Sequence, residues 1–190
     1  MKYSQNDEEE ILSGLIPKIP DIGYHSCEFG MNGTQNSNTY HLAEKGWKCT
    51  YIEKDLDRLK PIPNSPNITK LNRLVTYSNI NKILKEAELP IHFDILSIDI
   101  DGGDGMVWKG TTQFQPKIVI IEFNPYLQID KSFQPMIDIG YNKGYSLYTQ
   151  TGGNLIFVDS IYKDKVNLYS YQEAPNGFVW WKPHKNKTLI

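Results

Sequence analysis

The sequence predicts an α/β fold, a three-layer sandwich whose mostly parallel sheet ends in a C-terminal antiparallel hairpin. Three observations support this prediction. Short apolar runs alternate along the chain with segments that have the apolar spacing of helices, which is the pattern of βαβ units. Two runs, "FDILSIDI" and "PKIVIIEF", are nearly continuous in apolar residues, as expected of strands covered on both faces. Near the C-terminus, "YSLYTQ" and "NLIFVD" are joined by "TGG", which is typical of a hairpin.

A chain of 190 residues is most simply one domain, and we expect a core over about residues 22–160 followed by an extension over 161–190. The net charge of -2 offers no basic face for nucleic acid. The sequence has no apolar run of the ~20 residues that cross a bilayer, and its acidic start, "MKYSQNDEEE", does not resemble a signal peptide. We therefore expect a cytoplasmic or otherwise intracellular protein without a nucleic-acid or membrane partner. The oligomeric state stays open.

The first half of the chain is expected to begin with a helix over residues 8–15, "EEEILSGL", which is acidic in its first turn and stopped by Pro17. A strand, "YHSCEF", then leads through the turn "GMNGTQNSN" into a helix over residues 39–46 that ends at Gly46. "WKCTYIEKD" has the pattern of a second strand, and "NITKLNRLV" that of a third. The i, i+3, i+4 apolar spacing of "SNINKILKEAEL" predicts a helix that Pro90 closes.

The second half is expected to supply the fourth and fifth strands, "FDILSIDI" and "PKIVIIEFNP", and then a helix within "FQPMIDIGYNKG" before the hairpin. The aromatic and then basic tail from residue 167 has no pattern that predicts an element. Right-handed crossovers bring the carboxyl ends of all parallel strands to one edge of the sheet. Open α/β sheets bind their ligands at that edge, so the strand ends are where we look for a site.

Both cysteines, Cys27 and Cys49, fall within expected strands. Two cysteines provide neither a disulfide framework nor a metal knuckle. We expect both thiols to be reduced and to behave as small buried hydrophobes.

The turn after the first strand has the features of a cofactor loop. Gly30 and Gly33 would let the backbone approach a ligand closely, and Ser37 and Asn38 can cap the helix that follows or bind a carboxylate there. Glu53 ends the second strand about 20 residues downstream, the spacing at which an acid binds ribose hydroxyls in dinucleotide folds. These features fit NAD as well as S-adenosylmethionine. The absence of a strict G-x-G-x-x-G fingerprint and the terminal hairpin favour S-adenosylmethionine.

The motifs along the chain resemble those of a family of small class I S-adenosylmethionine-dependent methyltransferases, which have a Rossmann-like fold. That family combines E-F-G-x-x-x-G and S-N-T with a G-W and I-E pair, L-S-I-D-I-D-G, I-E-x-N-P, and K-G-Y ahead of a final hairpin. The corresponding stretches are "EFGMNG" with "SNT", "GWKCTYIE", "LSIDIDGGD", "IEFNP" and "NKGYSLYTQTGGNLIFV". The resemblance covers residues 28–158, and the motifs occur in the same order.

The resemblance implies a set of residues that bind S-adenosylmethionine. Gly30 and Gly33 would line the methionine portion, with Glu28 close by. Glu53 would hold the ribose diol, and Asn72, near the end of the third strand, would approach the adenine. Asn38 belongs to the same expected binding site.

Acidic and amide residues at the ends of the fourth and fifth strands suggest a second, catalytic half of the site. Asp99 and Asp101 are two residues apart, so we expect their side chains to share one face of the strand, and Glu122 and Asn124 repeat this spacing. Oxygen ligands of this kind suit Mg²⁺ or another divalent cation. Because unpaired carboxylates repel, we expect a cation, the sulfonium of the donor or Lys109 beside them. The alternative is a simple turn, which explains Asp before Gly well.

Some metal-dependent sugar and catechol O-methyltransferases carry a similar set of residues at these strand ends. By that resemblance Asp99, Glu122 and Asn124 would be the metal ligands, and Asp101 would be the general base that takes the proton of the acceptor. Without a metal, Asp101 or Asp99 could still act as the base.

Aromatic residues and one histidine are weaker candidates. Trp108, Trp180 and Trp181 could stack on the ring of an acceptor, although such residues more often pack in a core or an interface. His41, on the helix expected over residues 39–46, could face the site.

The sequence therefore predicts an S-adenosylmethionine-dependent O-methyltransferase that acts on a hydroxyl of a small molecule, with a sugar or nucleotide-sugar as the first choice. One alternative is a catalytically silent binding or assembly module with the same fold, although such a module has no need of Glu53 or of the strand-end acids. The other is an NAD-linked oxidoreductase, which the glycine pattern disfavours.

Overall fold

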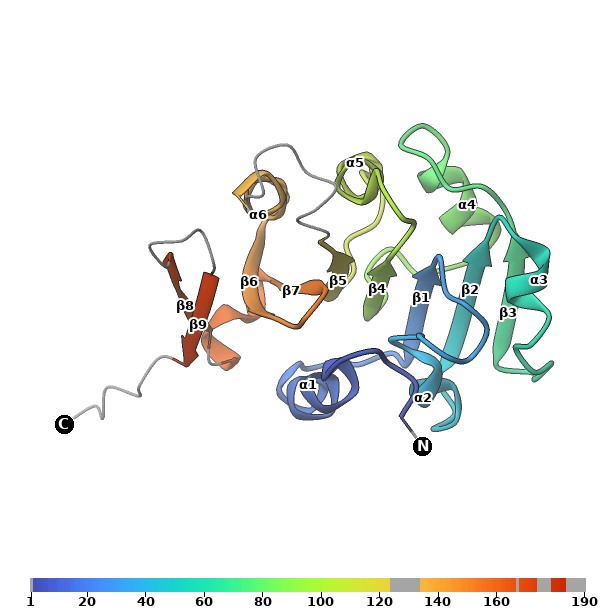
Figure 1. Cartoon of the computed structure of the whole chain (residues 1–190), viewed down its shortest axis with the longest axis horizontal. Coiled ribbons are helices and arrows are strands. Elements are labelled where there is room, and N and C mark those ends of the chain that lie inside the picture. Colours follow the sequence, from blue (N-terminus) through green and yellow to red (C-terminus); the bar gives the residue numbers. More distant parts are fainter. Residues whose placement is uncertain (1, 124–133, 167, 174–178, 184–190) are drawn as a thin grey trace.

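The computed structural model describes residues 2–123, 134–166, 168–173 and 179–183 (Figure 1). Helices and strands alternate through most of this part of the chain. The helices are α1 (Glu8–Leu15), α2 (Tyr40–Ala43), α3 (Leu56–Leu59), α4 (Ile80–Glu86), α5 (Asp104–Gly110) and α6 (Gln134–Asn142), with 3-10 turns at Ile16–Lys18 and Ser160–Lys165. The strands are β1 (His25–Phe29), β2 (Lys48–Glu53), β3 (Ile68–Asn72), β4 (Ile95–Ile98), β5 (Ile118–Glu122), β6 (Tyr145–Gln150), β7 (Asn154–Asp159), β8 (Tyr169–Glu173) and β9 (Val179–Pro183).

Seven strands form one sheet in the order β3-β2-β1-β4-β5-β7-β6. Strands β1 to β5 pair in parallel, and β7 runs antiparallel between β5 and β6. The predicted mostly parallel, Rossmann-like sheet with its C-terminal hairpin is confirmed. Because the chain moves from β1 outward to β3 and then returns to β4, the strand order reverses between β1 and β4, and ligands of open α/β sheets bind at such a point.

The helices cover both faces of the sheet and make three layers (Figure 1). On one face, apolar residues of α4, α5 and α6 pack on the sheet, and on the other those of α1, α2 and α3 do so. In β5 the side chains alternate between these layers, since Val119 and Ile121 belong to the first cluster while Ile118 and Ile120 belong to the second. This double burial explains why the strand is apolar at every position until Glu122. None of the described helices has the length and apolar character needed to span a bilayer.

Several elements differ from the expectation. Helix α3 lies in a segment for which the sequence predicted no element, and the tail without a predicted element contains the two-stranded sheet of β8 and β9. The third strand ends at Asn72 instead of continuing to residue 75. Among the described strands it lies at the edge of the sheet and pairs with β2, and its last partner, Glu53, is the last residue of β2.

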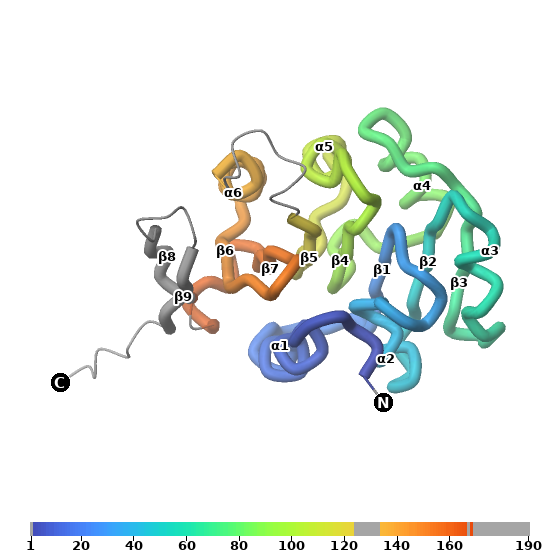
Figure 2. The backbone as a smooth tube through the Cα atoms, in the orientation of Figure 1, coloured from blue at the N-terminus to red at the C-terminus, as the bar shows by residue number. Residues whose placement is uncertain are grey.

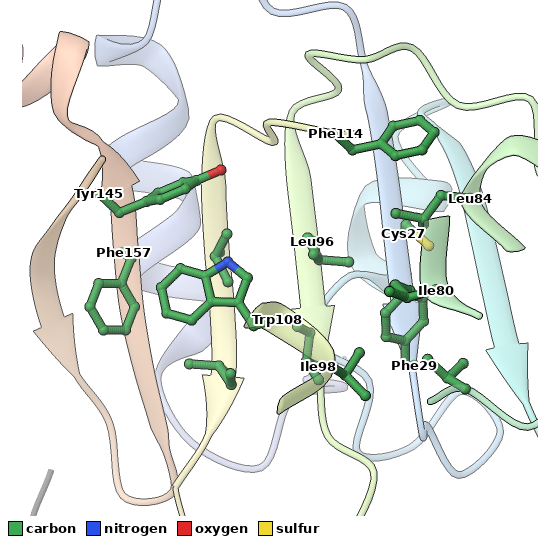
Figure 3. Packing of buried hydrophobic residues seen from close by; sticks show 14 of the residues in the cluster. Cys27, Phe29, Ile80, Leu84, Leu96, Ile98, Trp108, Phe114, Tyr145 and Phe157 are labelled. Atoms are coloured by element: carbon green, nitrogen blue, oxygen red, sulfur yellow. The ribbon is translucent and has the colours of Figure 1, made fainter. Parts of the chain in front are cut away.

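Trp108 is a core residue, which was the more common of the two roles considered for it, and it does not stack on an acceptor. Its side chain is fully buried, with ring centroids 4.8 Å from Phe157 and 5.4 Å from Tyr145 (Figure 3). The same packing requires a glycine at position 140 of α6, because a Cβ added to Gly140 would lie 2.6 Å from the Phe157 ring. The tryptophan thus joins α5 and α6 to the hairpin strands.

The N-terminal segment lies beside α2 in the backbone trace (Figure 2). The Tyr3 ring contacts the Tyr40 ring at 4.8 Å, and its hydroxyl donates to Glu44 at 2.6 Å. These contacts continue the layer of α1 and α2 over the first strands of the sheet.

Both cysteines are free and buried, and we expect their thiols to be inert in the folded protein. Burial raises the pKa of Cys49 to about 11 and raises that of Cys27 well above its usual value, so little thiolate is present at neutral pH. Titration with a thiol reagent should therefore be slow for the native protein and fast after unfolding. Rapid labelling of both thiols under native conditions would contradict this prediction.

Candidate functional site

A cleft of about 280 Å³ opens at the carboxyl ends of β1, β2 and β4, where the strand order reverses. One wall follows the ends of β2 and β3, and the other is the loop between β4 and α5. Its lining residues are Gly30, Ile52, Glu53, Lys54, Arg58, Arg73, Leu74, Val75, Ile100, Asp101 and Gly102. The cleft thus combines apolar walls with two carboxylates and three cations.

Gly30 and Gly33 both have positive φ, at 81° and 67°, which favours glycine. A Cβ on Gly30 would lie 1.4 Å from the carbonyl oxygen of Asp99, so the loop after β1 packs directly on the end of β4. Gly33 donates its N–H to the carbonyl of Arg58 at 3.0 Å, and a Cβ there would lie 3.2 Å from Pro61. Close packing within the protein is therefore sufficient to explain why glycine occupies both positions. Gly30 also lines the cleft, whereas Gly33 is buried outside it.

Glu28 is a buried carboxylate that orders the loop before α2. It accepts hydrogen bonds from the Ser37 hydroxyl at 2.7 Å, the Asn38 backbone N–H at 2.7 Å and the Thr39 hydroxyl at 2.6 Å. Burial raises the pKa of Glu28, and the hydrogen bonds from Thr39 and Ser37 oppose that rise. Its visible function is to fix the loop, and direct contact with a cofactor stays a prediction.

Asn38 links this loop to the neighbouring strand. Its side-chain amide donates to the Ser97 hydroxyl of β4 at 3.1 Å, and both residues are buried. A role for Asn38 in holding a ligand carboxylate likewise stays a prediction.

Glu53 is the last residue of β2 and lies in the wall of the cleft. One carboxylate oxygen, Oε1, accepts the N–H of Asp55 at 2.8 Å. Among the described residues no donor bonds to the second oxygen, Oε2. A carboxylate held by its own strand end with one oxygen free is suited to bind a pair of vicinal hydroxyls.

Asn72 braces the end of β2. Its side-chain amide donates to the backbone carbonyls of Glu53 and Lys54, each at 2.9 Å. The residues that line the cleft beside it are the next three in the chain, residues 73–75. Contact between Asn72 and an adenine ring stays a prediction, and this placement favours Leu74 and Val75 as the apolar surface for such a ring.

Asp99, Asp101 and Glu122 come together at the ends of β4 and β5. One carboxylate oxygen from each lies within 4.8 Å of the others. The expected reason for this proximity was wrong, however, because β4 ends at Ile98 and the acids do not share a face of the strand. Asp101 instead has a φ of 59°, and this left-handed turn brings its side chain back toward Asp99. Asn124, the fourth expected member, lies outside the described residues.

The acidic cluster of Asp99, Asp101 and Glu122 is electrostatically strained. Burial, followed by the charges of Glu122 and Asp104, raises the pKa of Asp99 to about 8. Burial and the charges of Asp104 and Asp101 also raise the pKa of Glu122, although a hydrogen bond with Asp99 opposes this. The protein therefore holds these carboxylates where protonation, or a bound cation, would relieve repulsion.

The basic side chain beside the cluster is Arg58 and not Lys109. Arg58 Nη1 lies 3.9 Å from Asp101 Oδ2, while within the described part of the chain no Lys, Arg or His nitrogen lies within 4.0 Å of Asp99 or Glu122. Lys109 is exposed on α5 and does not pair with the cluster.

Asp104, which was not among the residues expected at the site, shapes the loop between β4 and α5. It is the first residue of α5 and accepts the backbone N–H groups of Ile100 at 2.8 Å and Gly102 at 3.1 Å. These bonds hold the turn of residues 99–103, in which Gly102 and Gly103 have positive φ. The available signal was an acid in the first turn of a helix directly after "DGG".

Of the remaining candidates, His41 can be placed relative to the cleft. His41 lies on α2, is buried, and has no hydrogen-bond partner for either ring nitrogen among the described residues. It is not among the residues that line the cleft. The side chains of Trp180 and Trp181 lie outside the described part of the structure.

Comparisons with known proteins add little to this geometry. No family model matches the sequence, and no curated protein matches it. Among solved structures, the chain is similar to one titled "Crystal structure of putative S-adenosylmethionine dependent methyltransferase from Listeria monocytogenes". The identity is 17%, the match covers 95% of this chain and 75% of that chain, and the TM-score is 0.40. A likeness this distant carries no argument about function, which depends on the site itself.

Proposed function

We propose that the protein is an S-adenosylmethionine-dependent methyltransferase that methylates a hydroxyl group of a small molecule. The observation that carries this proposal is the placement of two carboxylates on opposite walls of one cleft, Glu53 at the end of β2 and Asp101 in the loop after β4. They sit on either side of the point where the strand order reverses. Glu53 is suited to bind the methyl donor, and Asp101 is suited to take a proton from the acceptor.

The residues of the cleft fit an adenosyl group. The free oxygen of Glu53 is available to the ribose hydroxyls, and Ile52, Leu74 and Val75 offer apolar surface to an adenine. Gly30 contributes a backbone without a side chain next to the strand end. S-adenosylmethionine, when bound, supplies an electrophilic methyl group.

Asp101 is the residue that we assign as general base. Its side chain is largely exposed at the cleft, where it can accept the proton of an acceptor hydroxyl. The Arg58 guanidinium lies 3.9 Å from this carboxylate, and both residues line the cleft. The turn held by Asp104 keeps this carboxylate next to Asp99.

Asp99 and Glu122 are the residues that would hold a divalent cation. Their oxygens are close together and have no cationic partner among the described residues, and carboxylates are the ligands that Mg²⁺ prefers. A cation there would lower the pKa of the acceptor hydroxyl. Asn124 remains a further proposed ligand. A hydroxyl-rich acceptor, a sugar or nucleotide-sugar, is our choice by analogy with the metal-dependent sugar methyltransferases.

A comparison of ligands in thermal unfolding tests this function. At 100-fold excess over its Kd a ligand stabilises the folded state by about 2.7 kcal/mol, which for this size corresponds to a Tm increase of about 5–10 °C. We expect S-adenosylmethionine and its product after methyl transfer, S-adenosylhomocysteine (the homocysteine product), to raise the Tm of the protein. We expect NAD to leave the Tm unchanged. A response to NAD alone would favour the oxidoreductase, and no response to any of the three would favour a silent module.

A further inference from the structure

Strand β7 lies beside β5 in the sheet (Figure 1). Asn154, the first residue of β7, lies directly opposite Glu122 of β5. The N–H of Phe123 donates to the carbonyl of Gly153 at 2.8 Å. Because hydrogen-bonded and non-hydrogen-bonded pairs alternate along an antiparallel ladder, the adjacent pair, Glu122 and Asn154, is a non-hydrogen-bonded pair. In an antiparallel sheet such pairs bring their side chains closest together, on the same face. The Asn154 amide is therefore an immediate neighbour of the acidic cluster.

The two ends of this amide are in different situations. Asn154 is 8% exposed, and its nitrogen Nδ2 donates to Glu8 Oε1 at 2.8 Å. Its oxygen Oδ1 is buried without a hydrogen-bond partner in the part of the chain that the structure describes. A buried amide oxygen without a partner is unfavourable, and such an atom calls for a specific explanation such as an ion.

Glu8 determines which way the amide faces. Its carboxylate can only accept hydrogen bonds, and it does so from the Thr151 hydroxyl at 2.5 Å and the Asn6 N–H at 3.0 Å as well as from Asn154. Asn154 must therefore turn its nitrogen toward α1. Its oxygen is directed away from α1, and Glu122 is the adjacent side chain across the ladder.

We propose that Asn154 Oδ1 is a ligand of the divalent cation held by Asp99 and Glu122, and that Glu8 is the positioning residue that keeps this oxygen turned toward the site. The inference rests on the proposed function, whose cation it completes. Amide oxygens are ordinary ligands of hard cations alongside carboxylates. The site would then draw on three neighbouring strands, β4, β5 and β7, and on the N-terminal helix, which is 146 residues from Asn154 in the chain.

Titration with Mn²⁺, an oxygen-seeking paramagnetic cation, tests the assignment without knowledge of the acceptor. Free Mn²⁺ is measured by electron paramagnetic resonance. We expect the wild-type protein to bind Mn²⁺ and Asn154→Leu to bind it about 10–100-fold more weakly, and we expect Glu8→Gln to lose about tenfold because a glutamine also donates and lets the amide reverse.

Thr151→Val is the matched control. It removes the hydroxyl that donates to Glu8 Oε1 at 2.5 Å but keeps the Asn154 oxygen, so Mn²⁺ affinity should stay within about twofold of wild type. No Mn²⁺ binding by the wild type, an unchanged affinity in Asn154→Leu, or an equal loss in Thr151→Val would each overturn the proposal.

The affinity of every variant for the homocysteine product is measured in parallel by calorimetry and should be unchanged, because Asn154 and Glu8 do not line the cleft. A variant that fails to fold would lose both kinds of binding, whereas the proposal requires loss of Mn²⁺ binding alone. If the wild type binds Mn²⁺ as expected but not the product, the proposed function fails and the cation ligand stands.

Discussion

Glu53→Ala is expected to weaken binding of the homocysteine product about 10²–10⁴-fold. The change removes two hydrogen bonds between a charged carboxylate and the ribose hydroxyls, each worth about 1.5–3 kcal/mol, and every 1.4 kcal/mol is about tenfold in affinity. Isothermal titration calorimetry measures this directly. Glu53 lies at a strand end, and within the described residues its side chain accepts a single hydrogen bond, from the N–H of Asp55, so the fold should survive the change.

Asp55→Ala is the matched control for this prediction. Asp55 is an exposed acid two residues away whose side chain accepts the N–H of Asp57 as the cap of α3, and it does not line the cleft. Its removal should cost helix stability of ~1 kcal/mol and leave product affinity unchanged. Equal affinities of Glu53→Ala and wild type would show that Glu53 is not the ribose ligand.

Asp101→Asn is expected to reduce turnover about 10²–10⁴-fold, because it removes the proposed proton acceptor. Asparagine tolerates the left-handed backbone of this position, where φ is 59°, so the loop should keep its shape. Binding of the homocysteine product and of Mn²⁺ should persist. Rates of methyl transfer to a panel of sugars and nucleotide-sugars, followed with labelled donor, provide the measurement.

Asp99→Asn separates the proposed cation from the base. It removes a ligand, so Mn²⁺ affinity should fall while product binding persists, and a chelator should reproduce its effect on turnover. If a chelator leaves the rate of turnover unchanged, the reaction does not need a cation, and the assignment of Asp101 as the base is unaffected. If Asp99→Asn and Asp101→Asn both kept full activity on the true acceptor, these acids would have no catalytic role and would serve only to form a turn.

The regular part of the fold was predictable because burial imposes local patterns. Helix α1 and both hairpin strands have the predicted bounds, 8–15, 145–150 and 154–159. Acidic residues and prolines delimit the helix, and a "TGG" turn fixes the hairpin. Helix α3 and the pair β8 and β9 were missed, since four- and five-residue elements carry too little periodicity to stand out from a loop.

The site was predictable only in outline. Parallel strands place their ends at one edge, and this argument correctly brings Asp99, Asp101 and Glu122 together. The details depend on contacts that no local pattern contains. The left-handed turn at Asp101 is held by Asp104 through two backbone bonds, and Asn154 is turned by Glu8 from the other end of the chain.

The central claim is that the donor binds in the cleft between the end of β2 and the loop after β4. Amide NMR spectra of the isotope-labelled protein, recorded as the homocysteine product is added, test it most directly. We predict large shifts for Gly30, Glu53, Leu74 and Asp101, which line the cleft, and none for His25 and Lys48 at the opposite ends of β1 and β2. An unchanged spectrum at saturating product, or shifts confined to residues away from the cleft, would contradict the account.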